Sequence, residues 1–139
     1  MLDEYFRARA QGFQGGTYRV FTPDPEVFVP PRGAFVLVED GDGSVVGCGG
    51  IRRLGDTDEG PRFEVKHLWL RPETRGRGWG RALLAELERR SRELGAATLV
   101  LDTNASLLAA GGLYRSSGFV EVAPYNDNPN ATHWYAKRL

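Results

Sequence analysis

The sequence has 139 residues, long enough for one domain with a hydrophobic core of its own. Hydrophobic residues make up 41% of the chain and charged residues 26%, a composition that excludes a disordered or fibrous protein. The 18 basic residues balance the 18 acidic ones, which argues against a broad surface for nucleic acid or an anionic membrane. We therefore expect a single domain over residues 1–139, as a monomer or homodimer, with no nucleic-acid or membrane partner.

The cysteine content and the N-terminus bear on the cellular compartment. Cys48 is the single cysteine, so it cannot form an internal disulfide. The opening residues "MLDEYFRARAQGF" are charged and lack the long apolar segment of a signal peptide or membrane span. We expect a protein of the reducing cytoplasm in which Cys48, within an apolar strand, is an inert buried thiol.

Hydrophobic periodicity and turn residues predict a mixed α/β domain around one sheet. The predicted elements, in chain order, are a helix over 2–12, strands over 17–21, 33–40, 44–54 and 62–70, a helix through about residue 94, a strand over 97–103, a helix over 105–117, and strands over 119–123 and 132–139. The prolines of residues 22–33 predict a rigid loop, and the polar run 55–61 predicts a second loop. Asp–Gly pairs at 40–43 predict a hairpin, and Gly95 predicts a helix end.

The stretch "RPETRGRGWGRALLAEL", residues 71–87, places three glycines and four arginines before a helix pattern. Glycine disfavours a helix interior by roughly 1 kcal/mol per residue, so this helix entrance needs a reason for its glycines. Backbone amides at a helix N-terminus bind anions such as pyrophosphate. No lysine followed by serine or threonine completes a P-loop, and the glycine spacing G-x-G-x-G departs from the dinucleotide fingerprint G-x-G-x-x-G. An alternative is a solvated basic face without a ligand.

The segment "RGRGWG", residues 75–80, fits the pattern R-x-x-G-x-G and resembles the pyrophosphate-binding motif of the GNAT superfamily of acyl-CoA N-acyltransferases. The resemblance continues through "LVLDTN" and "AGGLYRSSGF" and covers roughly residues 34–139, so residues 1–33 form an atypical N-terminal region. It implies a single-domain mixed sheet of the GNAT type, with helices packed on the sheet. It also implies that the strands 62–70 and 98–102 are parallel neighbours that splay apart to admit the cofactor.

The resemblance implies acetyl-CoA as co-substrate. No metal site is expected, because His67 and His133 are far apart in the sequence and neither is accompanied by cysteine or a cluster of carboxylates. The residues that it places at the cofactor are Leu68, Trp69, Leu70, Arg75, Gly76, Arg77, Gly78, Trp79, Gly80, Arg81 and Asn104. Many family members hold the cofactor arm with an asparagine seven residues before the helix tyrosine, where this sequence has Leu107. Asn104 is a substitute for that asparagine or, equally, a helix cap.

Glu64 matches the spacing of a general-base glutamate found in part of the superfamily, six residues before Leu70. In a strand of period two, Glu64 points to the same side as Leu68 and Leu70 unless a bulge intervenes. An ordinary carboxylate is a poor direct base for an alkylammonium, so this role requires a water relay or burial. The alternative is a surface glutamate paired with Lys66 or Arg62.

Tyr114, in "GGLYRSSGF", matches the family tyrosine that donates a proton to the leaving thiolate. The alternative is a core tyrosine whose hydroxyl bonds to the sheet. The family also roofs its acceptor site with two helices, where this sequence has only the proline loop. Residues 123–134 are the candidate replacement, with aromatic walls from Tyr125, His133 and Trp134 and an ammonium-attracting Asp127. A polar turn is the alternative for this segment.

These features together predict an N-acetyltransferase that moves acetyl from acetyl-CoA to a primary amine of a small molecule or peptide. The resemblance implies direct attack in a ternary complex, with Glu64 and Tyr114 as the catalytic pair. The alternative function is a non-catalytic acyl-CoA-binding module, in which the glycine turn is kept and the acid–base pair is incidental.

Overall fold

The computed structural model describes residues 25–74, 76–104 and 108–139. The predicted helix 2–12 and strand 17–21 lie outside the described residues. The elements in chain order are η1 (Pro25–Phe28), β1 (Gly33–Glu39), β2 (Val45–Thr57), β3 (Gly60–Leu70), η2 (Pro72–Thr74), α2 (Trp79–Glu93), β4 (Thr98–Thr103), α3 (Leu108–Ser116), β5 (Val120–Val122) and β6 (His133–Arg138).

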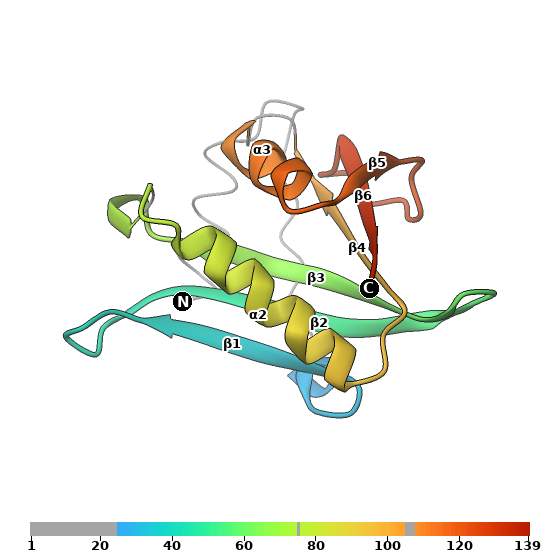
Figure 1. Cartoon of the computed structure of the whole chain (residues 1–139), viewed down its shortest axis with the longest axis horizontal. Coiled ribbons are helices and arrows are strands. Elements are labelled where there is room, and N and C mark those ends of the chain that lie inside the picture. Colours follow the sequence, from blue (N-terminus) through green and yellow to red (C-terminus); the bar gives the residue numbers. More distant parts are fainter. Residues whose placement is uncertain (1–24, 75, 105–107) are drawn as a thin grey trace.

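The described strands form a six-stranded sheet in the order β1-β2-β3-β4-β6-β5 (Figure 1). The pair β3 and β4 is parallel and the other neighbouring pairs are antiparallel. The parallel pairing extends only from Arg62↔Thr98 to Glu64↔Val100, and beyond these residues the two strands diverge. The predicted mixed sheet with a splay between these strands is therefore confirmed.

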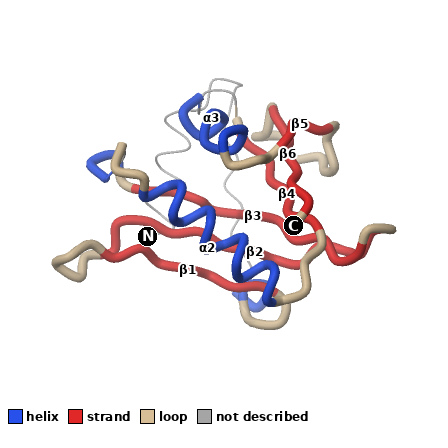
Figure 2. Tube along the Cα trace, viewed as in Figure 1, coloured by secondary structure: helices blue, strands red, loops and turns tan. Residues whose placement is uncertain are grey.

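The core lies between the sheet and the helices α2 and α3 (Figure 2). Leu83, Leu84 and Leu87 of α2 and Tyr114 of α3 pack against sheet residues that include Phe63. We call this side of the sheet the helix face and the opposite side the reverse face. Neither of these helices, nor any other described one, is long and apolar enough to cross a membrane.

Helix α2 follows the sequence prediction closely. Its apolar side chains are buried at the helical spacing that the sequence showed, with Leu84 and Leu87 at 0% exposure. The helix ends at Glu93, and Gly95 adopts a φ of 93° while its amide bonds to the carbonyl of Arg92 at 3.0 Å. The predicted stop at Gly95 is confirmed, because a left-handed residue that closes a helix in this way favours glycine.

The predicted loop 55–61 is wrong, because the β2–β3 hairpin extends through most of it. The register continues to Thr57↔Gly60, which leaves Asp58 and Glu59 as the turn. Gly60 adopts a φ of 116°, and its left-handed conformation makes so tight a turn possible. The hairpin therefore carries two carboxylates at its tip, beside the start of β4.

The proline loop 22–33 is also more structured than expected in its described part, since it contains η1. Phe28 of this element lies on the reverse face, where its ring is 5.6 Å from that of Phe35 and 5.8 Å from that of His67. Gly50 makes room for it, because a Cβ at Gly50 would lie 2.7 Å from the Phe28 ring. The apolar phenylalanine drives this local order by burying its ring against the sheet.

A β-bulge in β3 decides which residues share a face. Cys48 pairs with Trp69 and Gly50 with Lys66, so Gly49 stands opposite the two residues His67 and Leu68. His67 adopts a φ of 58°, the left-handed conformation that such a bulge allows. Side chains along a strand alternate between the two faces of the sheet, and the extra residue shifts this alternation by one position. Residues before the bulge and residues after it therefore follow different alternating patterns.

The bulge separates Glu64 from Leu68 and Leu70. Leu68 lies on the helix face, because a Cβ at Gly49 would contact both Leu68 at 3.3 Å and Leu87 of α2 at 2.9 Å. Glu64 points to the reverse face, where Lys66 lies 3.7 Å from its carboxylate. The sequence predicted that Glu64 shares a face with Leu68 and Leu70 unless a bulge intervenes. The bulge is present, so Glu64 lies on the other face of the sheet.

Candidate functional site

The glycine turn leads into the N-terminus of α2. Gly76 and Gly78 each have a φ of 79°, and Gly78 is the N-cap without a side-chain capping bond. A residue with a side chain would be strained at both positions, although a Cβ at either would meet nothing within 4 Å. The glycines are therefore needed for the backbone path, and the outer surface of the turn is open. Arg75 lies outside the described residues.

The first turn of α2 holds the other predicted cofactor residues. The exposed Arg77 stacks its guanidinium on the Trp79 ring, 5.8 Å from the centroid. Arg81 donates to the Ser116 hydroxyl at 2.9 Å and so ties the start of α2 to the end of α3. Gly80 lies against α3, since a Cβ there would be 3.4 Å from Leu113. Because the side chains of Arg77 and Arg81 already make these contacts, the main chain of the turn is better placed than the two arginines to bind an anion.

The two strands that border the splay, β3 and β4, carry buried polar groups. Trp69, on β3, is 7% exposed and Thr103, at the end of β4, is 3% exposed. The Trp69 Nε1 and Thr103 Oγ1 atoms are buried and have no hydrogen-bond partner among the described residues. Asn104 follows β4 and its side-chain amide donates to the Asn130 carbonyl at 3.1 Å. This bond ties the end of β4 to the segment 123–132.

Glu64 is a buried residue rather than a surface one. Its side chain is 0% exposed, and its carboxylate accepts hydrogen bonds from Arg52 Nε at 2.8 Å and from the Tyr125 hydroxyl at 2.6 Å. The surface pairing with Arg62 is therefore wrong, and Arg52 is the partner because β2 and β3 pair in the register Arg52↔Glu64. Lys66 makes a longer contact at 3.7 Å.

Tyr125 reaches Glu64 from a segment 61 residues further along the chain. Sequence reasoning placed Tyr125 in the acceptor site but did not find this contact. Burial, followed by the nearby charges of Glu64 and Asp102, raises the pKa of the Tyr125 hydroxyl far above its usual value. The hydroxyl therefore stays protonated and is the hydrogen-bond donor to Glu64.

Asp102, at the end of β4, extends the polar cluster of the reverse face. Lys66 Nζ lies 3.3 Å from one carboxylate oxygen, and the Asn126 side-chain amide donates to the other at 2.7 Å. Burial acts to raise the pKa of Asp102, but Lys66 and the asparagine side chains outweigh it and leave that pKa below its usual value. Asp102 and its asparagine partner thereby fix the segment that carries Tyr125.

The other aromatic and acidic residues proposed for the acceptor site lie elsewhere. Trp134 donates its indole N–H to the Asn126 side chain at 2.9 Å, so it helps to hold the segment 123–132 in place. His133 lies 3.9 Å from Glu121, and Asp127 is exposed. Of these four residues, Tyr125 is the one that lines the described cavity.

Tyr114 lies in α3 and packs on the helix face of the sheet, whereas Glu64 points to the reverse face. It is 5% exposed, and its ring is 5.7 Å from that of Tyr135 and 6.1 Å from that of Phe119. The ring is thus part of the core, as the alternative interpretation expected. A core position of the ring is compatible with either role of the hydroxyl.

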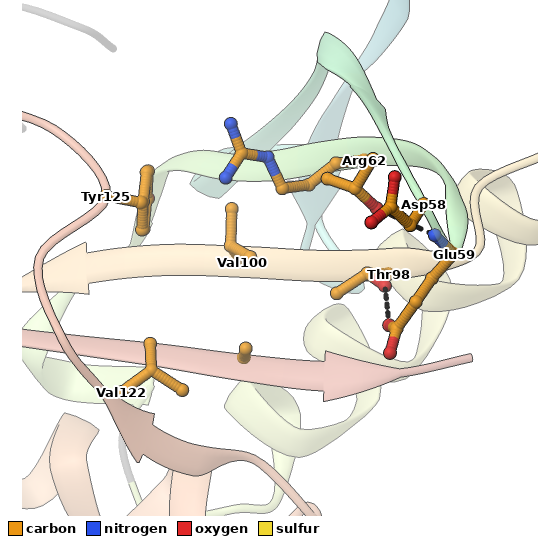
Figure 3. Close-up of a pocket in the computed structure, with 9 residues that line it drawn as sticks. Asp58, Glu59, Arg62, Thr98, Val100, Val122 and Tyr125 are labelled. Carbon is orange, nitrogen blue, oxygen red and sulfur yellow. Dashed lines mark hydrogen bonds between the residues drawn. The ribbon is translucent and has the colours of Figure 1, made fainter.

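A cavity of about 420 Å³ opens on the reverse face beside Tyr125 (Figure 3). Its lining residues come from the β2–β3 hairpin, β4, β5, β6 and the segment 123–132. They are Thr57, Asp58, Glu59, Arg62, Thr98, Val100, Val122, Tyr125 and Ala136. This cavity lies next to Glu64 and away from the glycine turn.

Two further chemistries can be assessed in the described part of the chain. No group of three or more histidine, cysteine or acidic side chains there could hold a metal ion. Cys48 is 0% exposed, and burial raises the pKa of its thiol to about 12. Its sulfur bonds to the His67 carbonyl at 3.2 Å, so the thiol is poorly placed for nucleophilic attack.

Comparison with known proteins agrees with this geometry. The family model described as Acetyltransferase (GNAT) family matches residues 1–119. An uncharacterised N-acetyltransferase of Schizosaccharomyces pombe is 40% identical over 101 residues, which cover 72% of this chain and 60% of that protein. This chain therefore spans less than two thirds of that curated relative.

Two solved structures share the fold. A GNAT-family acetyltransferase of Staphylococcus aureus superposes with a TM-score of 0.71 at 19% identity, over 81% of this chain and 72% of that one. The N-acetylglutamate synthase of Neisseria gonorrhoeae, complexed with coenzyme A and N-acetyl-glutamate, gives a TM-score of 0.63 at 23% identity, over 76% of this chain and 25% of that one. The family match, the relative and the splayed sheet together establish that this chain belongs to the GNAT family of acetyltransferases.

Proposed function

We propose that this protein transfers an acetyl group from acetyl-CoA to a primary amine of a small molecule or peptide, by direct attack in a ternary complex. The observation that carries the proposal is the left-handed Gly76–Gly78 turn at the start of α2, placed directly after a strand that splays from its parallel neighbour. The turn offers a site for pyrophosphate, and the splay offers a slot for the pantetheine arm.

The pyrophosphate would bind the main chain of residues 76–81. The open amides of a helix N-terminus and the positive end of its dipole attract an anion, and glycine allows it to approach closely. The arm would then run along β3, whose pairing with β4 stops at Glu64. Beyond that residue β3 and β4 no longer pair with each other, so the arm would lie between these two strands.

The buried polar atoms of β3 and β4 support a ligand in the same place. Trp69 Nε1 and Thr103 Oγ1 lack partners among the described residues, and a buried polar atom left unbonded costs stability. A ligand rich in amide and hydroxyl groups, as a pantetheine arm is, could satisfy such atoms. The neighbour of this fold from Neisseria gonorrhoeae holds coenzyme A, which is consistent with this assignment.

Deprotonation of the acceptor is assigned to Glu64 acting through Tyr125. Glu64 is fully buried, so the ammonium proton would pass to the Tyr125 oxygen while the Tyr125 proton moves to the Glu64 carboxylate. This relay replaces the water relay that the sequence left open. It leaves a neutral amine whose lone pair attacks the thioester carbonyl.

The tetrahedral intermediate then collapses with cleavage of the C–S bond. Its nitrogen releases its surplus proton to solvent to give the amide, and Tyr114 regains a proton from solvent after the transfer to sulfur. The departing thiolate takes its proton from Tyr114, which the resemblance assigns as the acid and which lies on the helix face of the splay. A thioester lodged in the splay would have Tyr114 on one side and the Glu64–Tyr125 pair on the other. The two groups would thus serve the two proton transfers without competing.

The experiment combines calorimetric titration of coenzyme A with an assay of free thiol released from acetyl-CoA, against a panel of amines, amino acids, polyamines and peptides. The expected result is coenzyme A binding and thiol release that depends on the amine. Binding without amine-dependent release would instead identify a non-catalytic acyl-CoA-binding module. Absence of binding would contradict both functions.

A further inference from the structure

The cavity on the reverse face combines an apolar floor with one cationic wall. Val100 of β4 pairs with Ala136 of β6, and Val122 of β5 pairs with the neighbouring Trp134, so small apolar side chains floor the cavity across three strands. Arg62 extends over Val100 toward Tyr125 (Figure 3). The volume of about 420 Å³ falls within the range of small-molecule sites.

Arg62 is a half-buried cation that has no anionic partner among the described residues. Its guanidinium lies 5.5 Å from the centroid of the Tyr125 ring, and its Nε atom is buried without a hydrogen-bond partner among the described residues. None of the ion pairs found in the described part of the chain includes Arg62. A guanidinium carries five N–H donors suited to bidentate binding of a carboxylate, so this one is prepared to take an anion.

The neighbouring cations of the reverse face are already paired. Arg52 bonds to Glu64, and Lys66 bonds to Asp102. At the far end of the cavity, Glu59 is held by Arg138 and by the Thr98 hydroxyl. Among the cations of the described cavity wall and its surroundings, Arg62 is therefore the one without an ion-pair partner, while Asp58 at the hairpin tip adds a carboxylate to the same wall.

The place of Arg62 relative to Glu64 connects the cavity with the chemistry. The two residues are two apart on β3 and precede the bulge, so their side chains leave the same face about 6–7 Å apart. Tyr125 spans this interval, because its ring lies beside Arg62 and its hydroxyl donates to Glu64. A ligand anion bound at Arg62 would therefore place a nearby amine beside the Tyr125 hydroxyl.

On the basis of the proposed acetyl transfer, we propose that this cavity is the acceptor site and that its acceptor is a small amine bearing a free carboxylate, which Arg62 binds. The hydrocarbon part of the acceptor packs on Val100 and Val122. A peptide, whose carboxyl group beside the amine is an amide, lacks the anion that Arg62 requires. The site thus selects amino acids over peptides and over simple amines.

The test compares acceptors that share a hydrocarbon part and carry either a carboxylate or an amide: 4-aminobutanoate with 4-aminobutanamide, and leucine with leucinamide. We expect kcat/KM for each acid to exceed that of its amide by at least ~10-fold, as the loss of a charge-assisted hydrogen bond implies. Arg62→Gln should remove this preference, and Arg62→Lys should keep part of it. The matched control is Arg53→Gln, since Arg53 is exposed and pairs with Asp56 on the same hairpin.

A binding measurement separates the acceptor assignment from the acetyl transfer itself. Protein saturated with coenzyme A is titrated with 4-methylpentanoate and 4-methylpentanamide, neither of which can be acetylated, and NMR shifts are followed. We expect binding of the acid alone, and its loss in a folded Arg62→Gln variant with an unchanged melting temperature. Equal rates for acids and amides, or acid binding that survives Arg62→Gln, would overturn the carboxylate site while leaving acetyl transfer intact. Failure to acetylate any amine would refute the transfer, and with it the acceptor assignment.

Discussion

The carboxylate of Glu64 contacts groups from three separate parts of the chain: Arg52 of β2, Lys66 of β3 and Tyr125 of the segment 123–132. Because Glu64 is 0% exposed, a proton reaches it through one of its neighbours. Tyr125 is the neighbour that also lines the cavity. The short 2.6 Å bond between the two oxygens makes this hydroxyl the natural path.

Replacement of Tyr125 by phenylalanine isolates that path. Tyr125→Phe keeps the ring beside Arg62 but removes the hydroxyl, so kcat should fall about 10²-fold, the usual scale for acid–base catalysis, while coenzyme A affinity is retained. Tyr135→Phe is the matched control, since its hydroxyl bonds to Arg115 on the helix face. Steady-state kinetics of the two variants checks the prediction. Full turnover in a folded Tyr125→Phe protein would exclude the relay.

Replacement of Tyr114 by phenylalanine tests the proton donor to the thiolate. The ring packing against Phe119 and Tyr135 is preserved, so the melting temperature should change little. We expect kcat to fall about 10²-fold, and less with an acyl donor whose thiol has a lower pKa. If kcat is unaffected, the hydroxyl is structural and the proton comes from elsewhere.

The buried thiol of Cys48 gives a prediction about pH. Because burial raises its pKa to about 12, the thiol stays protonated in the folded protein from pH 7 to 9. Its contribution to stability is present below the ordinary thiol pKa and is lost as the pH rises toward 12. Alkylation by iodoacetamide at pH 8.5, followed by mass spectrometry, should modify the unfolded protein and spare the folded one. Rapid labelling of the native protein would reopen Cys48 as a nucleophile.

At the scale of elements, the glycine turn can be tested by a pair of equally strained variants. Gly78 has a φ of 79° at the start of α2, and Gly43 has a φ of 80° in the distant β1–β2 hairpin. An added Cβ would meet nothing within 4 Å at either position. Alanine should therefore destabilise the protein by about 1–2 kcal/mol in both cases through backbone strain alone.

Only Gly78→Ala should also weaken coenzyme A binding, because it turns the amides of the anion site away. Thermal unfolding and calorimetric titration of both variants measure the two effects. Similar losses of affinity in Gly43→Ala and Gly78→Ala would show that general destabilisation, and not the turn, controls binding.

The elements also show what the sequence can and cannot predict. Leucine spacing and Gly95 were enough to predict α2, because helix burial and termination depend on local residue types. The bulge at His67 was not predictable, since a left-handed histidine is held by tertiary contacts such as that with Phe28. The partners of Glu64 were missed for the same reason: Arg52 follows from the register, and Tyr125 lies 61 residues away.

The described sheet of the whole molecule consists of two halves, which the short parallel pairing of β3 with β4 joins and the splay separates. The strands β1–β3 carry α2, and β4–β6 carry α3 (Figure 1). Besides the three β3–β4 pairs, side chains connect the halves, among them Arg81 with Ser116 at 2.9 Å and Lys137 with Glu88 at 2.9 Å. Acetyl-CoA in the splay would contact both halves, so its binding should raise the stability of the domain.

In the proposed direct attack, acetyl passes from coenzyme A to the acceptor amine without an acyl-enzyme. Protein, acetyl-CoA and an acceptor amine are mixed, and one mass-spectrometric time course follows coenzyme A, acetylated amine and intact protein. We expect coenzyme A and acetylated amine to appear in equal amounts while the protein keeps its mass. Formation of coenzyme A without acetylated amine, or a protein heavier by one acetyl group, would contradict the proposed direct attack.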